Sequence, residues 1–292
     1  MDRLPAPRYV IITPARDEGE YIEKTIHSVL SQTIKPVRWI VVNDGSNDDT
    51  GKIIDEYVRG YSWIKAVHRK NRGFRKAGGG VIEAFYDGYN LIDFKDWEFI
   101  IKLDGDLSFD ADYFQKCFGY FEENPKLGIG GGAIYNKVNG GLELEKTPVF
   151  HVRGATKIYR RECWEAIRGL IEAPGWDTVD EVKANMLGWQ TQTFPDIKVV
   201  QLKPTGEADG TWRDLTKHGR ANYIAGYHPL FMAVKCLKRL GQKPYLMGSV
   251  ALLYGFISGY TEKIPQIEDR ALIEYLRKQQ LRRLVFKPTI WK

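Results

Sequence analysis

Residues 99–110 read FIIKLDGDLSFD, an apolar segment that ends in two aspartates separated by one glycine. The apolar run from Phe99 to Leu103 predicts a buried strand, so Asp104 and Asp106 lie at its carboxyl end. Two neighbouring carboxylates repel each other and raise each other's pKa values. We therefore expect a positive charge beside them.

The residues before this stretch alternate between strand and helix patterns. We expect strands at 9–13, 38–43, 63–68 and 99–103, and helices at 21–32, through 53–57, and from about 77 to 89. Such alternation predicts an α/β fold, a parallel sheet with crossover helices.

Polar segments follow each of the four predicted strands, and they read PARDEGE, DGSNDDT, RKNRGFRK and DGD. In sheets of this kind, ligands bind beyond the carboxyl ends of the strands. Any one of these loops could be an ordinary polar turn. The four together, which mix acids, bases and glycines, predict a single binding site at that edge.

The composition excludes several classes of protein. A chain of 292 residues suits one large α/β domain with appendages or two modest domains. A hydrophobic content of 43% is ample for a sizeable core. Three cysteines without a CxxC pattern argue against a disulfide framework or a structural zinc site. The N-terminal residues lack a secretory signal, so we expect a cytoplasmic protein.

The excess positive charge lies near the C-terminus. The net charge is +6, yet residues 235–292 contain twelve Lys or Arg and only four Asp or Glu, so the rest of the chain is slightly acidic. A basic region of this kind suggests an anionic partner, either lipid headgroups or nucleic acid. Because the region contains no recognisable nucleic-acid-binding module, we expect a membrane surface and no nucleic acid.

Within this basic region, residues 244–261 read PYLMGSVALLYGFISGYT and contain no charge. A spanning helix needs about 20 predominantly apolar residues, and this segment is shorter and diluted by glycine, serine and tyrosine. Basic segments flank it, and the second, YLRKQQLRRLVFK, has a mixed amphipathic pattern. The pattern predicts a peripheral segment lying in the plane of the membrane. The alternative is a buried helical hairpin packed on the rest of the protein.

Three of the loops contain residues that could bind particular chemical groups. Asp104 and Asp106, with Gly105 allowing a tight turn, can share Mg or Mn, which commonly binds one or two carboxylates plus substrate phosphates. Asp44, just beyond a strand, can accept hydrogen bonds from a nucleobase or a ribose, although an Asx turn is the simpler alternative. Arg72 and Lys76 suit a phosphate.

Other features narrow the class of enzyme. Asp48 or Asp49 is expected to cap the helix that follows Asp44. Neither GxGxxG nor GxxxxGK[ST] occurs in the loop that contains Arg72, so nothing here indicates a dinucleotide oxidoreductase or a P-loop NTPase.

The segments TPARDEGEYIEKTIHSVLSQTIKPVRWIVVNDGSNDDT and DGD resemble the family 2 glycosyltransferases of the GT-A fold. The resemblance covers most of residues 8–110 and continues less clearly to about 205. It implies a nucleotide-sugar donor, UDP- or GDP-linked, a divalent Mn or Mg ion held by Asp106 and Asp104, and inversion at the anomeric carbon. Together with the loop chemistry it gives these donor-binding candidates: Pro14, Ala15, Arg16, Asp17, Glu18, Asp44, Arg72, Lys76, Asp104 and Gly105.

An inverting transfer also needs a base that removes the proton of the acceptor hydroxyl. The resemblance places this base in GWDTVDEVKANMLGW, where we favour Asp180 and keep Asp177 and Glu181 as alternatives. Acids in the first turn of a helix could instead only complement its dipole. The acceptor side is expected to include His151, Arg153 and Trp176, although a packing role is the alternative for the first two.

We therefore predict a GT-A domain over residues 6–205, with a nucleotide-binding half at 6–127 and an acceptor half at 128–205, followed by a helical basic region at 206–292. The predicted activity is that of a metal-dependent inverting hexosyltransferase acting on a lipid-linked or polysaccharide glycan. A nucleotidyltransferase-like enzyme and a non-catalytic nucleotide-sugar binding module are the alternatives. Nucleotidyltransferases usually have a glycine- and arginine-rich loop after the first strand, and TPARDEGE is not such a loop.

Overall fold

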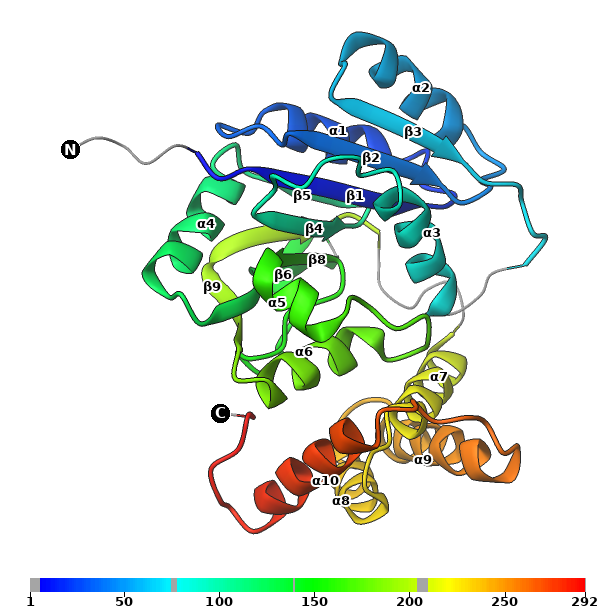
Figure 1. Cartoon of the computed structure of the whole chain (residues 1–292). Coiled ribbons are helices and arrows are strands. Elements are labelled where there is room, and N and C mark those ends of the chain that lie inside the picture. The colour runs from blue at the N-terminus through cyan, green and yellow to red at the C-terminus, as the bar shows by residue number, and fades with distance from the viewer. Residues whose placement is uncertain (1–5, 75–77, 139, 204–209, 292) are drawn as a thin grey trace.

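A computed structural model describes residues 6–74, 78–138, 140–203 and 210–291. Within these residues the chain forms a nine-stranded sheet covered by helices, with four further helices packed below it (Figure 1). The strands are β1 (Tyr9–Ala15), β2 (Arg38–Asn43), β3 (Ile64–His68), β4 (Phe99–Leu103), β5 (Leu107–Phe109), β6 (Leu127–Val138), β7 (Gly141–Leu144), β8 (Thr156–Arg160) and β9 (Gln190–Gln201). The helices are α1 (Ile22–Leu30), α2 (Thr50–Gly60), α3 (Gly79–Tyr89), α4 (Tyr113–Glu123), α5 (Arg161–Ile167), α6 (Trp176–Met186), α7 (Thr211–Ile224), α8 (Pro229–Arg239), α9 (Tyr245–Thr261) and α10 (Arg270–Leu284).

The strand order is β3-β2-β1-β4-β8-β6-β9-β5, with β7 paired to β6. The four predicted strands, β1 to β4, are mutually parallel, so their carboxyl ends lie at one edge as expected. Strand β8 joins β4 in the antiparallel direction, and β6 and β9 run parallel to each other beyond it. The predicted α/β fold is confirmed, and the boundaries of the predicted elements are correct to within about two residues.

Alternation along β1 creates two separate cores, one on each face of the sheet. Tyr9 and Ile11 pack with α1, α2 and α4, whereas Val10 and Ile12 pack with α3, α5 and α6. All four of these side chains are fully buried. The first strand is therefore continuously apolar because both of its faces are covered.

The glycine-rich segment that starts the second half of the domain is strand β6. A Cβ atom at Gly131 would lie 2.4 Å from the carbonyl oxygen of Thr156, and one at Gly132 would lie 2.7 Å from that of Ile197. Because real Cβ atoms do not approach backbone this closely, these two positions require glycine. The run thus serves close packing against β8 and β9.

The C-terminal helices form a third core together with α6. Val179 and Val182 of α6 pack with Tyr223, Leu252 and Leu272 of the C-terminal helices. No helix in the described part of the chain is long and apolar enough to cross a membrane.

Helix α9 lies against α7 through glycines. A Cβ atom at Gly255 would lie 2.0 Å from the carbonyl oxygen of Thr216, and one at Gly219 would lie 2.0 Å from that of Leu252. The two helix backbones are therefore in direct contact. Residues 245–261 thus form one helix and not the hairpin of the predicted alternative; one face of α9 is buried, as that alternative expects, while the opposite face is exposed.

We predict that Gly255→Ala destabilises the protein by about 1–3 kcal/mol, because the new methyl group forces α7 and α9 apart. The matched control is Gly119→Ala in α4, where an added Cβ has nothing within 4 Å. The control should be neutral or stabilise by up to about 1 kcal/mol, since alanine favours a helix. Urea unfolding of both variants checks this, and equal stability of the two would contradict the close contact.

Candidate active site

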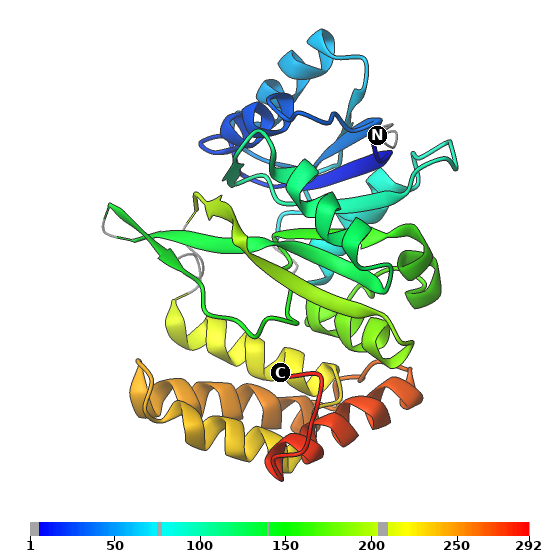
Figure 2. The same ribbon diagram turned by 90° about the vertical axis from the view of Figure 1, so that its left-hand side faces the viewer.

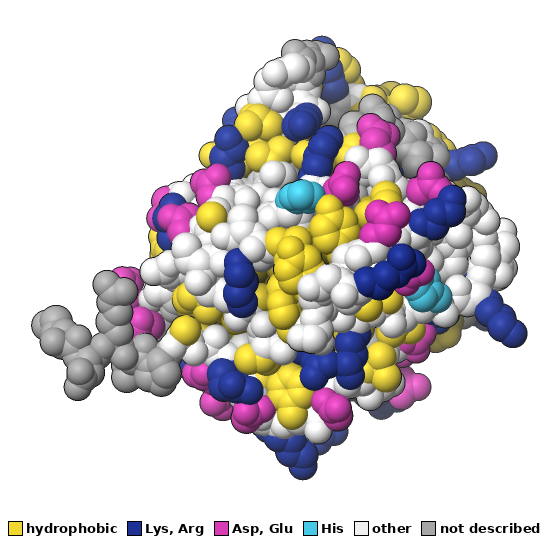
Figure 3. Space-filling model, turned by 90° about the horizontal axis from the view of Figure 1, so that it is seen from above, with side chains coloured by type: hydrophobic (Ala, Val, Ile, Leu, Met, Phe, Trp, Pro, Cys, Tyr) yellow, Lys and Arg dark blue, Asp and Glu magenta, His cyan; other side chains and the backbone are white. Residues whose placement is uncertain are grey.

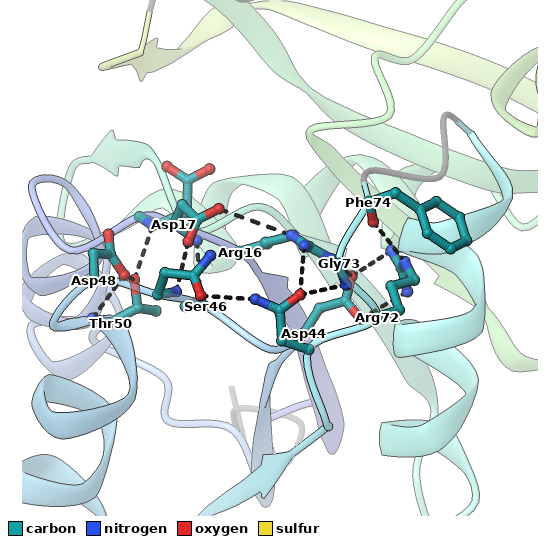
Figure 4. A network of polar contacts seen from close by, with 12 residues as sticks. Arg16, Asp17, Asp44, Ser46, Asp48, Thr50, Arg72, Gly73 and Phe74 are labelled. Atoms are coloured by element: carbon teal, nitrogen blue, oxygen red, sulfur yellow. Dashed lines mark hydrogen bonds and ion pairs between the residues drawn. The ribbon is translucent and has the colours of Figure 1, made fainter.

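The loops after β1, β2 and β3 meet around the buried carboxylate of Asp44 (Figure 4). Arg72 binds it with both terminal nitrogens, at 3.0 Å to Oδ1 and 2.7 Å to Oδ2. Arg69 lies 2.6 Å from Oδ1, and Arg16 lies 3.8 Å from Oδ2. Arg69 also lies 2.8 Å from Asp87, and Glu83 lies within 4.0 Å of both Arg69 and Arg72, so carboxylates balance the charge of these guanidinium groups. Guanidinium groups gathered in this way suit a phosphate-bearing ligand that takes the place of one carboxylate.

The loop after β1 is fastened to the loop after β2. The backbone N–H of Asp17 donates to Ser46 Oγ at 3.0 Å, and Asp17 Oδ1 accepts from the N–H of Asn47 at 2.8 Å. Asp17 has a φ of 54°, a left-handed conformation that is uncommon for a residue with a side chain. These bonds hold the loop in that strained shape beside Asp44.

The carboxylate of Asp48 forms a second set of hydrogen bonds between the same two loops. Its Oδ2 accepts from the N–H of Gly19 at 2.8 Å, and its Oδ1 accepts from the N–H of Thr50 at 3.0 Å. Asp49 occupies the cap position of α2, but its side chain makes no capping bond. Of the two predicted capping residues, Asp48 therefore satisfies the first turn of the helix.

The cation expected beside the DGD segment is Lys102, two residues before Asp104. Its ammonium group is almost fully buried and binds both Asp104 Oδ1 and the carbonyl oxygen of Gly154. Asp106 is 6% exposed, and Gln201 Nε2 donates to its Oδ2 at 3.2 Å. Burial, with a contribution from the charge of Asp104, raises the pKa of Asp106 to about 6.

Gly105 lies in a turn, as predicted, but it does not adopt a positive φ. A Cβ atom there would lie 2.9 Å from Ile22 Cδ1 and 3.6 Å from Glu18 Cγ. The glycine allows the DGD segment to lie directly beneath the loop that contains Glu18.

Glu18 adds a third carboxylate to this region. Lys203 Nζ lies 2.9 Å from its Oε1, whereas its Oε2 is buried and has no hydrogen-bond partner within the described residues. Burial raises the pKa of Glu18 to about 7, and the charges of Asp106 and Asp104 contribute in the same direction. The region is thus acidic and only partly compensated by two lysines.

These residues fit a divalent cation only in combination with a phosphate-bearing ligand. Within the described part of the chain, no group of three or more His, Cys, Asp or Glu side chains is arranged to hold a metal ion. However, one or two carboxylates plus substrate phosphates suffice for Mg or Mn. The unpaired Oε2 of Glu18 and the raised pKa of Asp106 indicate an environment that favours additional positive charge.

Two of the three base candidates are buried in an ion pair. Lys157 Nζ, on β8, lies 2.9 Å from both carboxylate oxygens of Asp180 and 2.9 Å from Glu181 Oε1. Tyr159 Oη donates to Asp180 Oδ2 at 2.6 Å. Asp180 is 3% exposed and Glu181 is fully buried, so neither carboxylate faces a substrate in this conformation.

Asp177 differs from the other two acids. Its side chain is partly exposed, and within the described residues its carboxylate forms no ion pair. Burial alone would raise its pKa, but the charges of Lys157, His151 and Arg153 outweigh that effect and lower it. Neighbouring cations therefore hold Asp177 ionised, and of the three acids it alone is partly exposed as a residue.

The predicted acceptor-side residues have packing partners. Trp176 is 6% exposed, with Lys102 Nζ and Lys157 Nζ at 5.3 and 5.5 Å from its ring. His151 Nδ1 lies 2.9 Å from Glu181 Oε2, and Arg153 Nε lies 3.1 Å from Glu145. Burial opposes protonation of His151, but Glu181 raises its pKa overall. Because the Trp176 ring is buried, it is not available to stack on an acceptor sugar.

The remaining predicted site residues lie at the end of β1 or outside the described residues. Pro14 and Ala15 are buried at the end of β1, beside Val42 and Asn43 of β2. Lys76 lies outside the described residues, as does the predicted boundary at 205. A cavity of about 580 Å³ lies elsewhere, lined by Phe150, Gln192, Arg282 and neighbours, and includes none of the predicted site residues.

Sequence patterns missed four basic residues that the site uses: Arg69, Lys102, Lys157 and Lys203. A signal existed for Lys102 and Lys157, because each interrupts an otherwise apolar or β-rich strand segment, FIIKL and TKIYR. A lysine in such a position must pair with an acid when it is buried.

A family model described as glycosyl transferase family 2 matches residues 10–172, more than half of the chain. The uncharacterized glycosyltransferase EpsJ of Bacillus subtilis is 31% identical over 131 residues, which cover 45% of this chain and 35% of that protein. The poly-β-1,6-N-acetyl-D-glucosamine synthase of Staphylococcus epidermidis is 32% identical over 124 residues, covering 41% and 27%. The chain thus spans about a third or less of the length of these curated relatives.

Solved structures agree on the fold. Staphylococcus aureus TarS 1–349, in complex with UDP, has a TM-score of 0.54 at 15% identity over 87% of this chain and 72% of that chain. The mannosyltransferase PcManGT of Pyrobaculum calidifontis, in complex with GDP-Man and Mn²⁺, has a TM-score of 0.55 at 17% identity over 92% and 79%. The predicted GT-A fold is confirmed by these likenesses.

The raised pKa of Glu18 predicts a pH effect on stability in metal-free buffer. Between the ordinary glutamate value and about 7, the folded state binds more protons at Glu18 than the unfolded state, so stability falls as pH rises. Glu18→Gln removes this pH dependence. Between pH 5 and pH 8 its free energy of unfolding should therefore rise by on the order of 2–3 kcal/mol relative to that of the parent. Urea unfolding at both pH values, with exposed Glu20→Gln as control, measures it, and an equal response of the two variants would contradict the burial of Glu18.

Proposed function

The chain belongs to glycosyl transferase family 2, and on that premise we propose that it transfers a hexose from a UDP- or GDP-linked donor to a hydroxyl group, with inversion at the anomeric carbon. The observation that supports this most strongly is the meeting of the Asp44–Arg72 pair, the Glu18 loop and the DGD segment at the carboxyl edge of β1 to β4. The relatives and structural neighbours carry names of sugar transferases and polysaccharide synthases.

The donor occupies the edge formed by the first four strands. Its base and ribose lie near Pro14, Asp17 and Asp44, and its diphosphate lies near Arg72 and Asp104. Because Arg69, Arg72 and Arg16 surround Asp44 in the structure without a ligand, the diphosphate replaces part of this charge pairing when it binds. Exchange of one anion for another leaves the arginines paired throughout.

Asp106 and Asp104 would hold a divalent cation together with the diphosphate. Mn or Mg there would supply positive charge that stabilises the leaving nucleoside diphosphate. The mannosyltransferase PcManGT was solved with Mn²⁺ and GDP-Man, in agreement with this assignment. Lys102 occupies one oxygen of Asp104 and Gln201 occupies one oxygen of Asp106, so each carboxylate has a further oxygen for the cation.

Asp177 is the general base in this proposal, in place of the favoured Asp180. Its carboxylate accepts the proton of the acceptor hydroxyl while the hydroxyl oxygen forms a bond to C1 of the sugar and the C1–O bond to the diphosphate breaks. A base must be ionised and reachable. Neighbouring cations lower the pKa of Asp177, and the residue is partly exposed, whereas Asp180 and Glu181 are buried against Lys157. Lys157 binds the carbonyl oxygen of Asp177 at 2.5 Å and so positions it.

The acceptor is a polysaccharide or a lipid-linked glycan at the cytoplasmic face of a membrane. The named relatives include a poly-β-1,6-N-acetyl-D-glucosamine synthase and a chondroitin synthase. The division of the chain into a transferase region, residues 6–205, and a basic helical region, residues 206–292, supports peripheral attachment through the second region. His151 and Arg153 lie on the acceptor side, near Asp177.

Asp177→Asn should slow sugar transfer by about 10²–10⁴-fold, because the amide cannot accept the proton. Binding of UDP or GDP should remain within about twofold of the parent, since the donor contacts are on other loops. The matched control, Asp180→Asn, should lose stability because Lys157 keeps only one of its two carboxylate partners, but it should retain transfer per folded molecule. Turnover of a panel of sugar nucleotides with glycan acceptors provides the measurement. Normal transfer by Asp177→Asn with loss in Asp180→Asn would reverse the assignment.

Asp106→Asn should remove the dependence of nucleoside diphosphate affinity on Mn or Mg. The amide is a weaker ligand for a hard cation, so the increase in affinity that the metal gives the parent should disappear. Calorimetric titration of UDP and GDP with and without Mn²⁺ provides the test. Metal-dependent binding in the parent without turnover of any donor would instead identify a nucleotide-sugar binding module.

A further inference from the structure

Helix α9 has an exposed apolar face that the rest of the chain does not cover. Eight of its large apolar or aromatic side chains are between 36% and 66% exposed, and the helix contains no charged residue. They are Tyr245, Leu246, Met247, Val250, Leu253, Tyr254, Ile257 and Tyr260. Five of these, at 246, 250, 253, 257 and 260, follow the spacing of one helical stripe.

This face is not part of an unfinished intramolecular core. The opposite side of α9 already packs on α7, where Gly255 and Gly259 bring the backbones and Tyr223 into contact. Figure 2 shows α7 between the sheet and α9, so the exposed side of α9 points away from the sheet. A contiguous apolar surface of this kind on a folded domain marks a contact with a partner.

Exposed lysines lie near both ends of the same helix. Lys243 lies two residues before α9, Lys263 lies two residues after it, and Lys238 lies in the last turn of α8, which packs on α9. Glu262, between α9 and Lys263, pairs with Arg220 at 2.7 Å. Trp212 of α7, 42% exposed, lies 6.4 Å from Tyr254, so aromatic side chains also border the surface. By contrast, the far side of the molecule, over α1 and α2, shows charges of both signs interspersed (Figure 3).

We propose that the exposed face of α9 docks in the headgroup region of an anionic lipid bilayer, with the helix lying in the membrane plane. This inference rests on the proposed function, because it supplies the surface through which the transferase reaches a membrane-presented acceptor. Apolar side chains framed by lysines, with tyrosine and tryptophan near the border, are what an interfacial helix requires. The absence of a spanning helix in the described residues agrees with docking in the plane of the membrane.

A second copy of this chain fits the face less well. Residues 235–292 have a surplus of eight positive charges, so a symmetric dimer through α9 would bring two basic surfaces together. An anionic bilayer compensates the same charge, with each nearby lysine attracted to the surface.

Helix α10, the second segment predicted from sequence, is used differently. Its Leu272 and Leu276 are buried in the third core. Its Arg277 and Arg282 donate to the backbone carbonyls of Gly226 and Pro288. Helix α9 therefore supplies the main apolar contact.

The test is co-sedimentation of the full chain with phosphatidylglycerol–phosphatidylcholine vesicles and with phosphatidylcholine vesicles alone. The parent should bind the anionic vesicles, and the triple variant Leu246→Gln, Leu253→Gln, Ile257→Gln should bind about tenfold more weakly. Glutamine favours a helix, and these positions are exposed, so thermal unfolding should not change. The matched control, Leu91→Gln, Leu144→Gln, Leu187→Gln, changes three exposed leucines of the catalytic region and should bind like the parent.

A charge variant, Lys238→Gln, Lys243→Gln, Lys263→Gln, should lose the preference for anionic vesicles. The proposal is overturned if the parent does not bind vesicles, or if the α9 variant and the leucine control variant bind vesicles equally. It is also overturned if ultracentrifugation finds a dimer that only the α9 variant disrupts. Binding of UDP or GDP in solution, measured in parallel, should be the same in all variants. If the parent binds neither UDP nor GDP, the proposed function is contradicted. If the parent binds nucleotide but no vesicles, only the docking surface is contradicted.

Discussion

A buried ammonium group at the junction of sheet and helix determines how the acceptor side is arranged. Lys157 Nζ, fully buried on β8, is within 2.9 Å of the carboxylates of Asp180 and Glu181 on α6. Removing charges from water is costly, and it is tolerable here only because each partner is hydrogen-bonded. Loss of Lys157 would leave two buried carboxylates without their cation. Helix α6 is thereby fixed in rotation, with Asp180 and Glu181 buried and Asp177 partly exposed.

A second buried lysine is arranged in a similar way beside the DGD segment. Lys102 holds Asp104, and the ammonium groups of Lys102 and Lys157 lie 5.3 and 5.5 Å from the indole ring of Trp176. Attraction between a cation and an aromatic face strengthens when water is excluded. The first residue of α6 is therefore held against the strand that precedes the DGD segment.

The sequence was sufficient for the fold, because the fold depends on periodicity. It also predicts a site at the carboxyl ends of the parallel strands, and the structure brings the loops after β2 and β3 together there around Asp44. It does not reveal that Asp180 and Glu181 are buried and Asp177 is partly exposed, because helical spacing alone does not show which way a helix is rotated. That rotation depends on Lys157, which sequence patterns treat as an ordinary strand residue. The purpose of Gly105 was likewise hidden, since crowding against Ile22 is a contact between distant segments. The uncharged run at 244–261 indicated a membrane or a core, and only packing on α7 separates the buried face from the exposed one.

Helix α6 also connects the site to the C-terminal helices. Its first turn has Trp176 and Asp177 beside β4 and β8, while Val179 and Val182 pack into the core formed with α7, α8, α9 and α10. Helix α7 in turn lies in backbone contact with α9. A continuous series of packed elements therefore joins Asp177 to the exposed face of α9. Because each contact in this series is close and well filled, the surface and Asp177 keep a defined orientation. The proposed docking surface and the proposed base, Asp177, depend on this rigidity, because a tilt of the surface would move Asp177 away from an acceptor presented at the membrane.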